Sequence, residues 1–160
     1  MLDKINEIYK SVRRLTGQYL GKKALKDREL KKSIADLNRE QLLSGRGADG
    51  EYLPRYVDDP YFKSVESATR YEQWKATISI GEKPTGVMDF YIDGTFHRTI
   101  KFVKDDEGFT TKSDSSIISS VQSKTNNQAL GINETSIEQI IPEVTEYLQS
   151  ILLTEIQKNI

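Results

Sequence analysis

Apolar residues near the N-terminus recur three or four positions apart, which is the spacing of a helix that buries one face. The pattern covers two stretches and predicts helices within residues 2–43. The first stretch carries Leu2, Ile5, Ile8, Tyr9, Val12 and Leu15, and the second carries Leu25, Leu30, Ile34, Leu37 and Leu42.

The same spacing predicts a long amphipathic helix at the C-terminus, over about residues 136–158. Thr135 followed by Glu138 matches a capping box at its start. Pro142 falls in the second turn and should bend the helix, because proline removes a backbone donor and crowds the preceding turn.

Residues 44–62 are rich in glycine, aspartate and proline, which favour turns. Aromatic residues are interleaved with them, so we expect an ordered surface loop. A short helix is predicted after it, over about residues 64–75.

The central segment predicts a β-hairpin. Strand-forming runs at 87–92 and 95–103 are separated by Asp93-Gly94, the dipeptide that a two-residue type I′ turn favours. This register places Asp89 opposite Arg98 as a cross-strand structural pair. It also makes His97 a structural residue on a strand face that is partly exposed to solvent, a half-wet face.

These elements predict one α+β domain over residues 1–160. Its antiparallel sheet, within about residues 78–112, is built around the hairpin at Asp93-Gly94. The N-terminal helices and the long C-terminal helix pack with this sheet.

Composition narrows the function classes. The chain has 23 basic and 24 acidic residues, a net charge of −1 and no cysteine, so disulfides and thiolate chemistry are excluded. We find no signal peptide and no apolar run of the ~20 residues that a membrane span needs. We therefore expect synthesis in a cytoplasm and no membrane partner.

The sequence shows no catalytic equipment. His97 is the only histidine, and no Gly-x-Ser-x-Gly nucleophile motif is present. The acidic clusters at 58–59 and 105–107 lie in turns, where aspartate is expected for backbone reasons. We predict a protein that is not an enzyme and has no metal and no cofactor. A carboxylate enzyme around residues 105–107 is the weakest of the functional hypotheses.

Charge is unevenly distributed. Basic residues dominate between Lys10 and Lys32, whereas the C-terminal helix is acidic. The basic face could be solvated, could bind nucleic acid, or could contact the acidic face of a neighbouring copy, which we favour. The candidate subunit-contact residues are the basic Arg13, Arg14, Lys22 and Lys23 and the loop aromatics Tyr52, Tyr56, Tyr61 and Phe62.

Three segments resemble the virion-morphogenesis (tail-completion) proteins of tailed bacteriophages. They are Gln41-Leu42-Leu43-Ser44-Gly45 continuing through Ala48-Asp49-Gly50 to Tyr56, Tyr61 and Lys63; then Asp89-Phe90-Tyr91-Ile92-Asp93-Gly94-Thr95-Phe96; and Ala129-Leu130-Gly131-Ile132-Asn133-Glu134-Thr135-Ser136. The resemblance covers residues 40–160 in order and lacks the threonine that usually precedes the family's Gly-Asp-Phe turn.

The resemblance implies a small α+β structural protein of the virion. Such a protein forms a homo-oligomeric ring in the phage neck, as a tail-completion, tail-terminator or head–tail connector subunit, and contacts neighbouring neck or tail proteins. The alternative function is a nucleic-acid-binding module that uses the basic face between Lys10 and Lys32.

Overall fold

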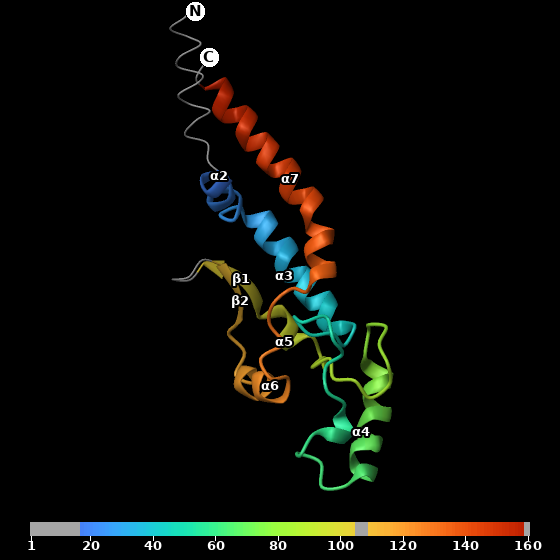
Figure 1. The fold of residues 1–160 in the computed structure, drawn as a ribbon. Coiled ribbons are helices and arrows are strands. Elements are labelled where there is room, and N and C mark those ends of the chain that lie inside the picture. The colour runs from blue at the N-terminus through green and yellow to red at the C-terminus, as the bar shows by residue number, and fades with distance from the viewer. Residues whose placement is uncertain (1–16, 105–108, 159–160) are drawn as a thin grey trace, which may run out of the picture.

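The structure is a computed structural model that describes residues 17–104 and 109–158. It has the predicted mixed α+β fold with a long C-terminal helix (Figure 1). The elements are α2 (Gly17–Ala24), α3 (Arg28–Leu43), the 3₁₀ helix η1 (Tyr56–Asp58), α4 (Val65–Ile78), α5 (Thr95–Arg98), β1 (Ile100–Lys104), β2 (Phe109–Ser113), α6 (Ile118–Lys124) and α7 (Glu134–Gln157). The apolar positions of the first predicted helical stretch, from Leu2 to Leu15, lie outside the described residues.

Helices α2, α3 and α7 lie side by side as an elongated arm (Figure 1). Their apolar faces meet in one hydrophobic cluster, which α2 and α3 enter through Ala24, Leu30 and Ile34 and α7 through Ile140 and Ile151. Asp27 caps α3 by accepting a hydrogen bond from the Leu30 backbone nitrogen at 2.9 Å. Helix α7 changes direction in its first half (Figure 1), and Pro142 lies inside the helix there.

The start of α7 differs from the predicted capping box. Asn133, two residues before Thr135, is the N-cap, and its side chain accepts a hydrogen bond from the Ser136 nitrogen at 3.0 Å. Asparagine is among the strongest N-cap residues. Asn133 therefore caps α7 in place of Thr135.

The predicted hairpin at Asp93-Gly94 is wrong. Gly94 has a φ of 77° and is the N-cap of α5, which spans residues that were expected to form a strand. The Asp93 side chain accepts a hydrogen bond from the Thr95 nitrogen at 2.8 Å. Here the Asp93 side chain closes a turn onto the Thr95 nitrogen and Gly94 supplies a positive φ, so the dipeptide that favours a hairpin turn leads into a short helix instead.

The sheet is smaller than predicted and lies later in the chain. β1 and β2 pair antiparallel, from Ile100 opposite Ser113 to Lys104 opposite Phe109. Of the first predicted strand, only Val87 forms a bridge, to Arg55. The apolar run at 87–92 forms no ladder: residues 87–89 are buried, Phe90 has a left-handed φ of 54°, and Ile92 is exposed.

The predicted Asp89–Arg98 pair is also absent from the described structure. Arg98 donates to the Asp93 carbonyl and to the Thr95 hydroxyl, each at 3.0 Å. Asp89 pairs with Lys75 of α4 instead. Without a hairpin, no strand register brings Asp89 and Arg98 together.

A second hydrophobic cluster forms the body below the arm. It joins Leu42 of α3 to buried residues from later parts of the chain: Leu53, Tyr56, Val87, Met88, Phe96, Ile100, Val121 and Ala129. Since Leu30 and Ile34 belong to the arm cluster, α3 contributes to both cores and connects them.

Two buried amides of α3 fix the segment that leads into α7. Asn38 donates to the Ala129 carbonyl at 3.1 Å, and Gln41 donates to the Gly131 carbonyl at 3.1 Å. The Gln41 side-chain oxygen also accepts from the Asn133 nitrogen at 2.8 Å. These bonds satisfy backbone groups of a segment that has no secondary structure of its own.

Replacing Gln41 with alanine should lower the free energy of unfolding by about 1–3 kcal/mol, because it leaves buried backbone groups of residues 131 and 133 unpaired. Urea unfolding followed by circular dichroism measures the change. The neighbouring Glu40→Ala is the control, since Glu40 is exposed and should shift stability by no more than about 0.5 kcal/mol. Equal effects of the two substitutions would show that the hydrogen bonds of Gln41 do not stabilise the segment before α7.

Candidate subunit interface

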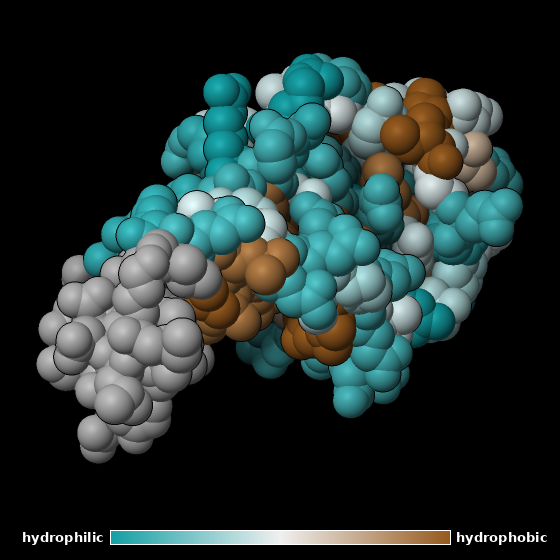
Figure 2. Space-filling view, turned by 90° about the horizontal axis from the view of Figure 1, so that it is seen from above, coloured by the Kyte–Doolittle hydropathy of each residue, from teal (hydrophilic) through white to brown (hydrophobic). Residues whose placement is uncertain are grey.

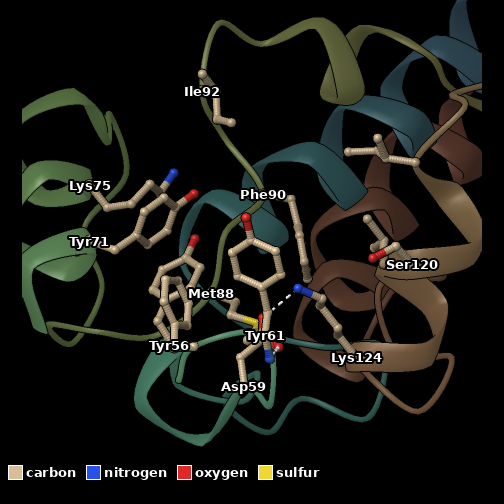
Figure 3. Close-up of a pocket in the computed structure, with 13 residues that line it drawn as sticks. Tyr56, Asp59, Tyr61, Tyr71, Lys75, Met88, Phe90, Ile92, Ser120 and Lys124 are labelled. Atoms are coloured by element: carbon tan, nitrogen blue, oxygen red, sulfur yellow. Dashed lines mark hydrogen bonds and ion pairs between the residues drawn. The ribbon is translucent and has the colours of Figure 1, made fainter. Parts of the chain in front are cut away.

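An aromatic cleft of about 400 Å³ opens between η1, α4 and α6 (Figure 3). The segment that was expected to be the first strand supplies Met88, Phe90 and Ile92 to its lining. The cleft therefore collects residues from four separate parts of the chain.

A chain of aromatic rings forms one wall. Tyr71 of α4 lies at its centre, with ring centroids 4.9 Å from Tyr56, 5.2 Å from Phe62 and 5.3 Å from Trp74. Tyr61 extends the chain through Phe62 at 5.3 Å. Offset and edge-on contacts of this kind hold aromatic side chains in defined orientations.

The rim of the cleft is apolar and open to solvent. Tyr61 is 77% exposed, Ile92 59% and Ile117 47%. Figure 2 shows hydrophobic residues in separate patches on an otherwise hydrophilic surface. Apolar exposure grouped around a concavity is typical of a surface that binds another macromolecule or a ligand.

The four predicted loop aromatics lie in four different environments. Tyr61 lies at the rim, Phe62 is half-buried in the wall, and Tyr56 is 6% exposed and belongs to the core. Tyr52 lies outside the cleft lining, where the Arg46 guanidinium stacks 4.1 Å from its ring centroid. Of the four predicted contact residues, Tyr61 and Phe62 are brought together at the cleft surface.

An ion pair underlies Tyr61. The buried Asp59 carboxylate pairs with Lys124 of α6 (dashed in Figure 3) and accepts a hydrogen bond from the Tyr61 backbone nitrogen at 3.0 Å. The Lys124 ammonium lies 5.4 Å from the Tyr61 ring centroid, within cation–π range. Asp59 was expected to be a turn residue, and it also anchors α6 to the aromatic wall.

The backbone is strained at the cleft. Phe90 has a φ of 54°, a left-handed conformation that costs a non-glycine residue roughly 1–3 kcal/mol. The strain directs Phe90 into the cleft lining, where its ring lies 6.1 Å from that of Phe96. Strained backbone of this kind concentrates at functional sites.

The strained segment is held by a buried ion pair behind the cleft. The Asp89 carboxylate is fully buried and lies 2.6 Å from the ammonium of Lys75, which is itself buried. Ser79 donates to Asp89 at 2.7 Å, the Tyr91 nitrogen at 2.9 Å and the Tyr56 hydroxyl at 3.4 Å. The Lys83 ammonium lies 3.6 Å away, so the buried carboxylate is fully coordinated by donors.

This environment shifts the pKa values of three groups. Burial alone would raise the pKa of Asp89, but hydrogen bonds from Lys75, Ser79 and the Tyr91 nitrogen outweigh it and hold the pKa below its usual value. Burial lowers the pKa of Lys75, and the Asp89 charge partly opposes this. Burial and the Asp89 charge raise the pKa of the Tyr56 hydroxyl.

His97 is not on a half-wet strand face. It is 5% exposed within α5, and neither ring nitrogen has a hydrogen-bond partner in the described part of the chain. Burial lowers its pKa to about 4, although the Asp89 charge acts in the opposite direction. The imidazole is therefore neutral at physiological pH and packs against the Tyr91 and Phe96 rings, each 5.6 Å away between centroids.

The predicted basic contact residues are only partly described. Lys22 is exposed on α2, whereas Lys23 pairs with Glu155 of α7. Arg13 and Arg14 lie outside the described residues. Part of the charge complementarity predicted between copies is thus used within one copy, along the arm.

Among residues 17–104 and 109–158, no group of three or more His, Cys, Asp and Glu side chains is placed to hold a metal ion. In the same residues, no helix is long and apolar enough to cross a membrane. The aromatic cleft is suited to binding an apolar side chain through shape and apolar contact, with few polar groups to orient it.

Comparison with protein-family models, with curated proteins and with solved structures found no match to this chain.

Replacing Lys75 with methionine should lower the free energy of unfolding by about 3–5 kcal/mol, because the buried Asp89 then loses its nearer charge partner and keeps only Lys83, 3.6 Å away. Adding Asp89→Asn should recover part of this loss, since the amide carries no charge. Chemical denaturation of both single variants and the double variant measures the coupling. Additive losses would show that the pair does not act as a unit.

His97 should make stability depend on pH between 6.5 and about 4. Its pKa in the folded state, about 4, lies below the ordinary value of 6.5, so the unfolded chain binds more protons in this window. Stability is full above pH 6.5 and falls as the pH drops, by about 3 kcal/mol at most.

In His97→Leu this dependence should disappear. The contribution of Asp89 is separate, because a depressed carboxyl pKa acts only below its unfolded value of about 3.9. The free energy of unfolding, measured with heat or urea at intervals between pH 4 and pH 7, distinguishes the contribution of His97 from that of Asp89. An unchanged slope in His97→Leu would exclude His97 as the titrating group.

Proposed function

We propose that the protein is a structural virion protein of a tailed phage, made in the bacterial host cytoplasm and assembled into a ring in the neck. It would serve as a tail-completion, tail-terminator or head–tail connector subunit, with no catalytic role. The observation that supports an assembly role most directly is the aromatic cleft, with its rim of exposed Tyr61, Ile92 and Ile117.

Three features of the cleft favour a protein partner. Its apolar lining is open to solvent, its rings are held by aromatic contacts and an ion pair, and its lining includes Phe90, whose backbone is strained. Tyrosine and phenylalanine are enriched at protein–protein interfaces because they supply large contact area with few rotatable bonds. Neighbouring copies and other neck or tail proteins are the partners that this function requires.

The three segments that resemble the phage family are spatially connected. Gln41 of the first segment bonds to Asn133 of the third, and the Ala48 nitrogen donates to the Gln128 carbonyl, next to the third segment, at 2.8 Å. The second segment lines the cleft through Phe90 and Ile92. Motifs that are separate in sequence thus form one structural unit, as expected if they act together.

DNA binding remains the second candidate function, because Lys22, Lys26, Arg28 and Lys32 are exposed near the start of the arm. This function predicts binding to duplex DNA that weakens steeply with salt. Substituting three of these residues should then abolish the binding.

Replacing Ile92 with aspartate should prevent assembly while leaving the monomer folded, because Ile92 is 59% exposed and its loss should cost the fold little. The cleft rim would instead carry a charge that a close-packed interface cannot solvate. Light scattering after size exclusion gives the mass, and negative-stain electron microscopy shows whether rings form. Ile80→Asp is the matched control, since Ile80 is 65% exposed and lies outside the cleft lining.

Mass spectrometry of purified phage particles tests the virion assignment directly. The proposal predicts the protein in the particle and rings from the purified wild-type protein. A protein that is absent from particles and stays monomeric at all concentrations would refute it.

A further inference from the structure

The charges of α3 run against the helix dipole. Arg28, Lys31 and Lys32 lie in its first turns, with Glu29 as the acidic exception. Asp36 and Glu40 lie toward its end, where Arg39 pairs with Asp36 and leaves Glu40 without a basic residue in the last turn. A helix is stabilised by acidic residues at its N-terminus and basic residues at its C-terminus. This arrangement is therefore unfavourable for the helix itself, and folding stability does not explain it.

The two charged ends are also too far apart to neutralise each other. Arg28 and Glu40 are separated by about 18 Å along the helix axis at 1.5 Å per residue. Charges in solution are screened beyond about 8 Å at physiological ionic strength. Each end must therefore find its counter-charge close by or in another molecule.

The basic end finds little counter-charge within the described residues. Lys22, Lys26, Arg28 and Lys32 are exposed, and none of them forms an ion pair inside residues 17–104 and 109–158. Asp27, which lies among them, is used as the cap of α3. Together with the half-exposed Lys31, these four residues at the junction of α2 and α3 are called the basic corner.

The acidic end of α3 borders a groove against α7. Two adjoining hollows of about 690 and 250 Å³ share Leu37, Glu40 and Gln139 in their linings. Six carboxylates line the two hollows and Arg46 is the one basic residue among the lining residues; the carboxylates belong to Asp36, Glu40, Asp49, Glu51, Glu134 and Glu143. We call this hollow surface the acidic groove.

We propose that the basic corner of one copy docks into the acidic groove of the next copy, so that the subunits join head to tail. The inference rests on the proposed ring function and names the partner and the polarity of one contact. Two different surfaces of the same chain that fit each other make a heterologous interface, which closes into a ring when the rotation between copies allows it.

The opposite charges of the two docked surfaces would offset the unfavourable interaction between the charges of α3 and its own helix dipole. In the assembled state each basic residue at the start of α3 would lie near carboxylates, and each carboxylate at its end near ammonium or guanidinium groups. Complementary charge of this kind chiefly sets partner choice and association rate. Association should therefore be fast at low salt and weak at high salt.

Two charge-reversal variants test the docking. One reverses the basic corner with Arg28→Glu, Lys31→Glu and Lys32→Glu, and the other reverses the groove with Glu40→Lys, Glu51→Lys and Glu134→Lys. Each alone should lose self-association at least tenfold by sedimentation velocity in 50 mM salt. Mixed together, the two variants should associate again, because each then offers the surface that the other lacks.

A stability measurement separates docking from a structural role. The basic-corner variant should melt at the same or a higher temperature than the wild type, since it places acidic residues at the start of α3. The control reverses Lys101, Lys104 and Lys112, exposed residues of β1 and β2, and should leave association unchanged.

Several outcomes overturn the inference. Rings that form equally well from the basic-corner variant would refute the docking while leaving the ring function intact. Absence of recovery in the mixture would exclude the acidic groove as the partner surface. If the wild-type protein binds duplex DNA but never self-associates, and the basic-corner variant loses the DNA binding, the basic corner would be assigned to nucleic acid.

Discussion

The shape of the cleft depends on the ion pairs and hydrogen bonds of one buried carboxylate, that of Asp89. It binds Lys75 of α4, Ser79 and Lys83 of the following segment, the Tyr91 nitrogen and the Tyr56 hydroxyl. Removing a charge from water is costly, so a buried carboxylate requires a full set of donors. Meeting that requirement draws four segments of the chain around one point and holds Phe90 in its strained conformation.

Helix α3 connects this body to the arm. Its apolar residues enter both hydrophobic clusters, and its two buried amides hold the segment that precedes α7. The arm is closed at its other end by the pairing of Lys23 with Glu155. Apolar burial supplies the stabilisation, whereas the polar contacts determine which segments meet.

The cleft and the charged surfaces of the arm have different physical properties, and a ring subunit can use both. An aromatic cleft offers close apolar contact, which gives an interface its strength. Separated opposite charges offer orientation and rate. In the proposed assembly, the charges would align neighbouring copies and the cleft would hold a partner once aligned.

The sequence by itself determined the elements whose signals are local. Helical periodicity located α3 and α7 to within a few residues, turn residues marked the loop at 44–62, and the α+β class followed. It also placed the aromatic residues that form the cleft, because Tyr61 and Phe62 stood out in a turn-rich segment. Periodicity and capping depend on neighbours along the chain, so one sequence is enough to detect them.

Tertiary structure decided everything that depends on distant partners. Asp93-Gly94 is compatible with a hairpin turn and with the start of a helix. In the structure it starts α5, and Asp89 is paired with Lys75 in the core. The run at 87–92 begins in the hydrophobic core with Val87 and Met88 and ends at the exposed Ile92, and in the described residues only Val87 forms a bridge, to Arg55. The burial of His97 and the ion pair of Asp59 with Lys124 likewise arise from contacts between segments far apart in sequence, and no local pattern encodes them.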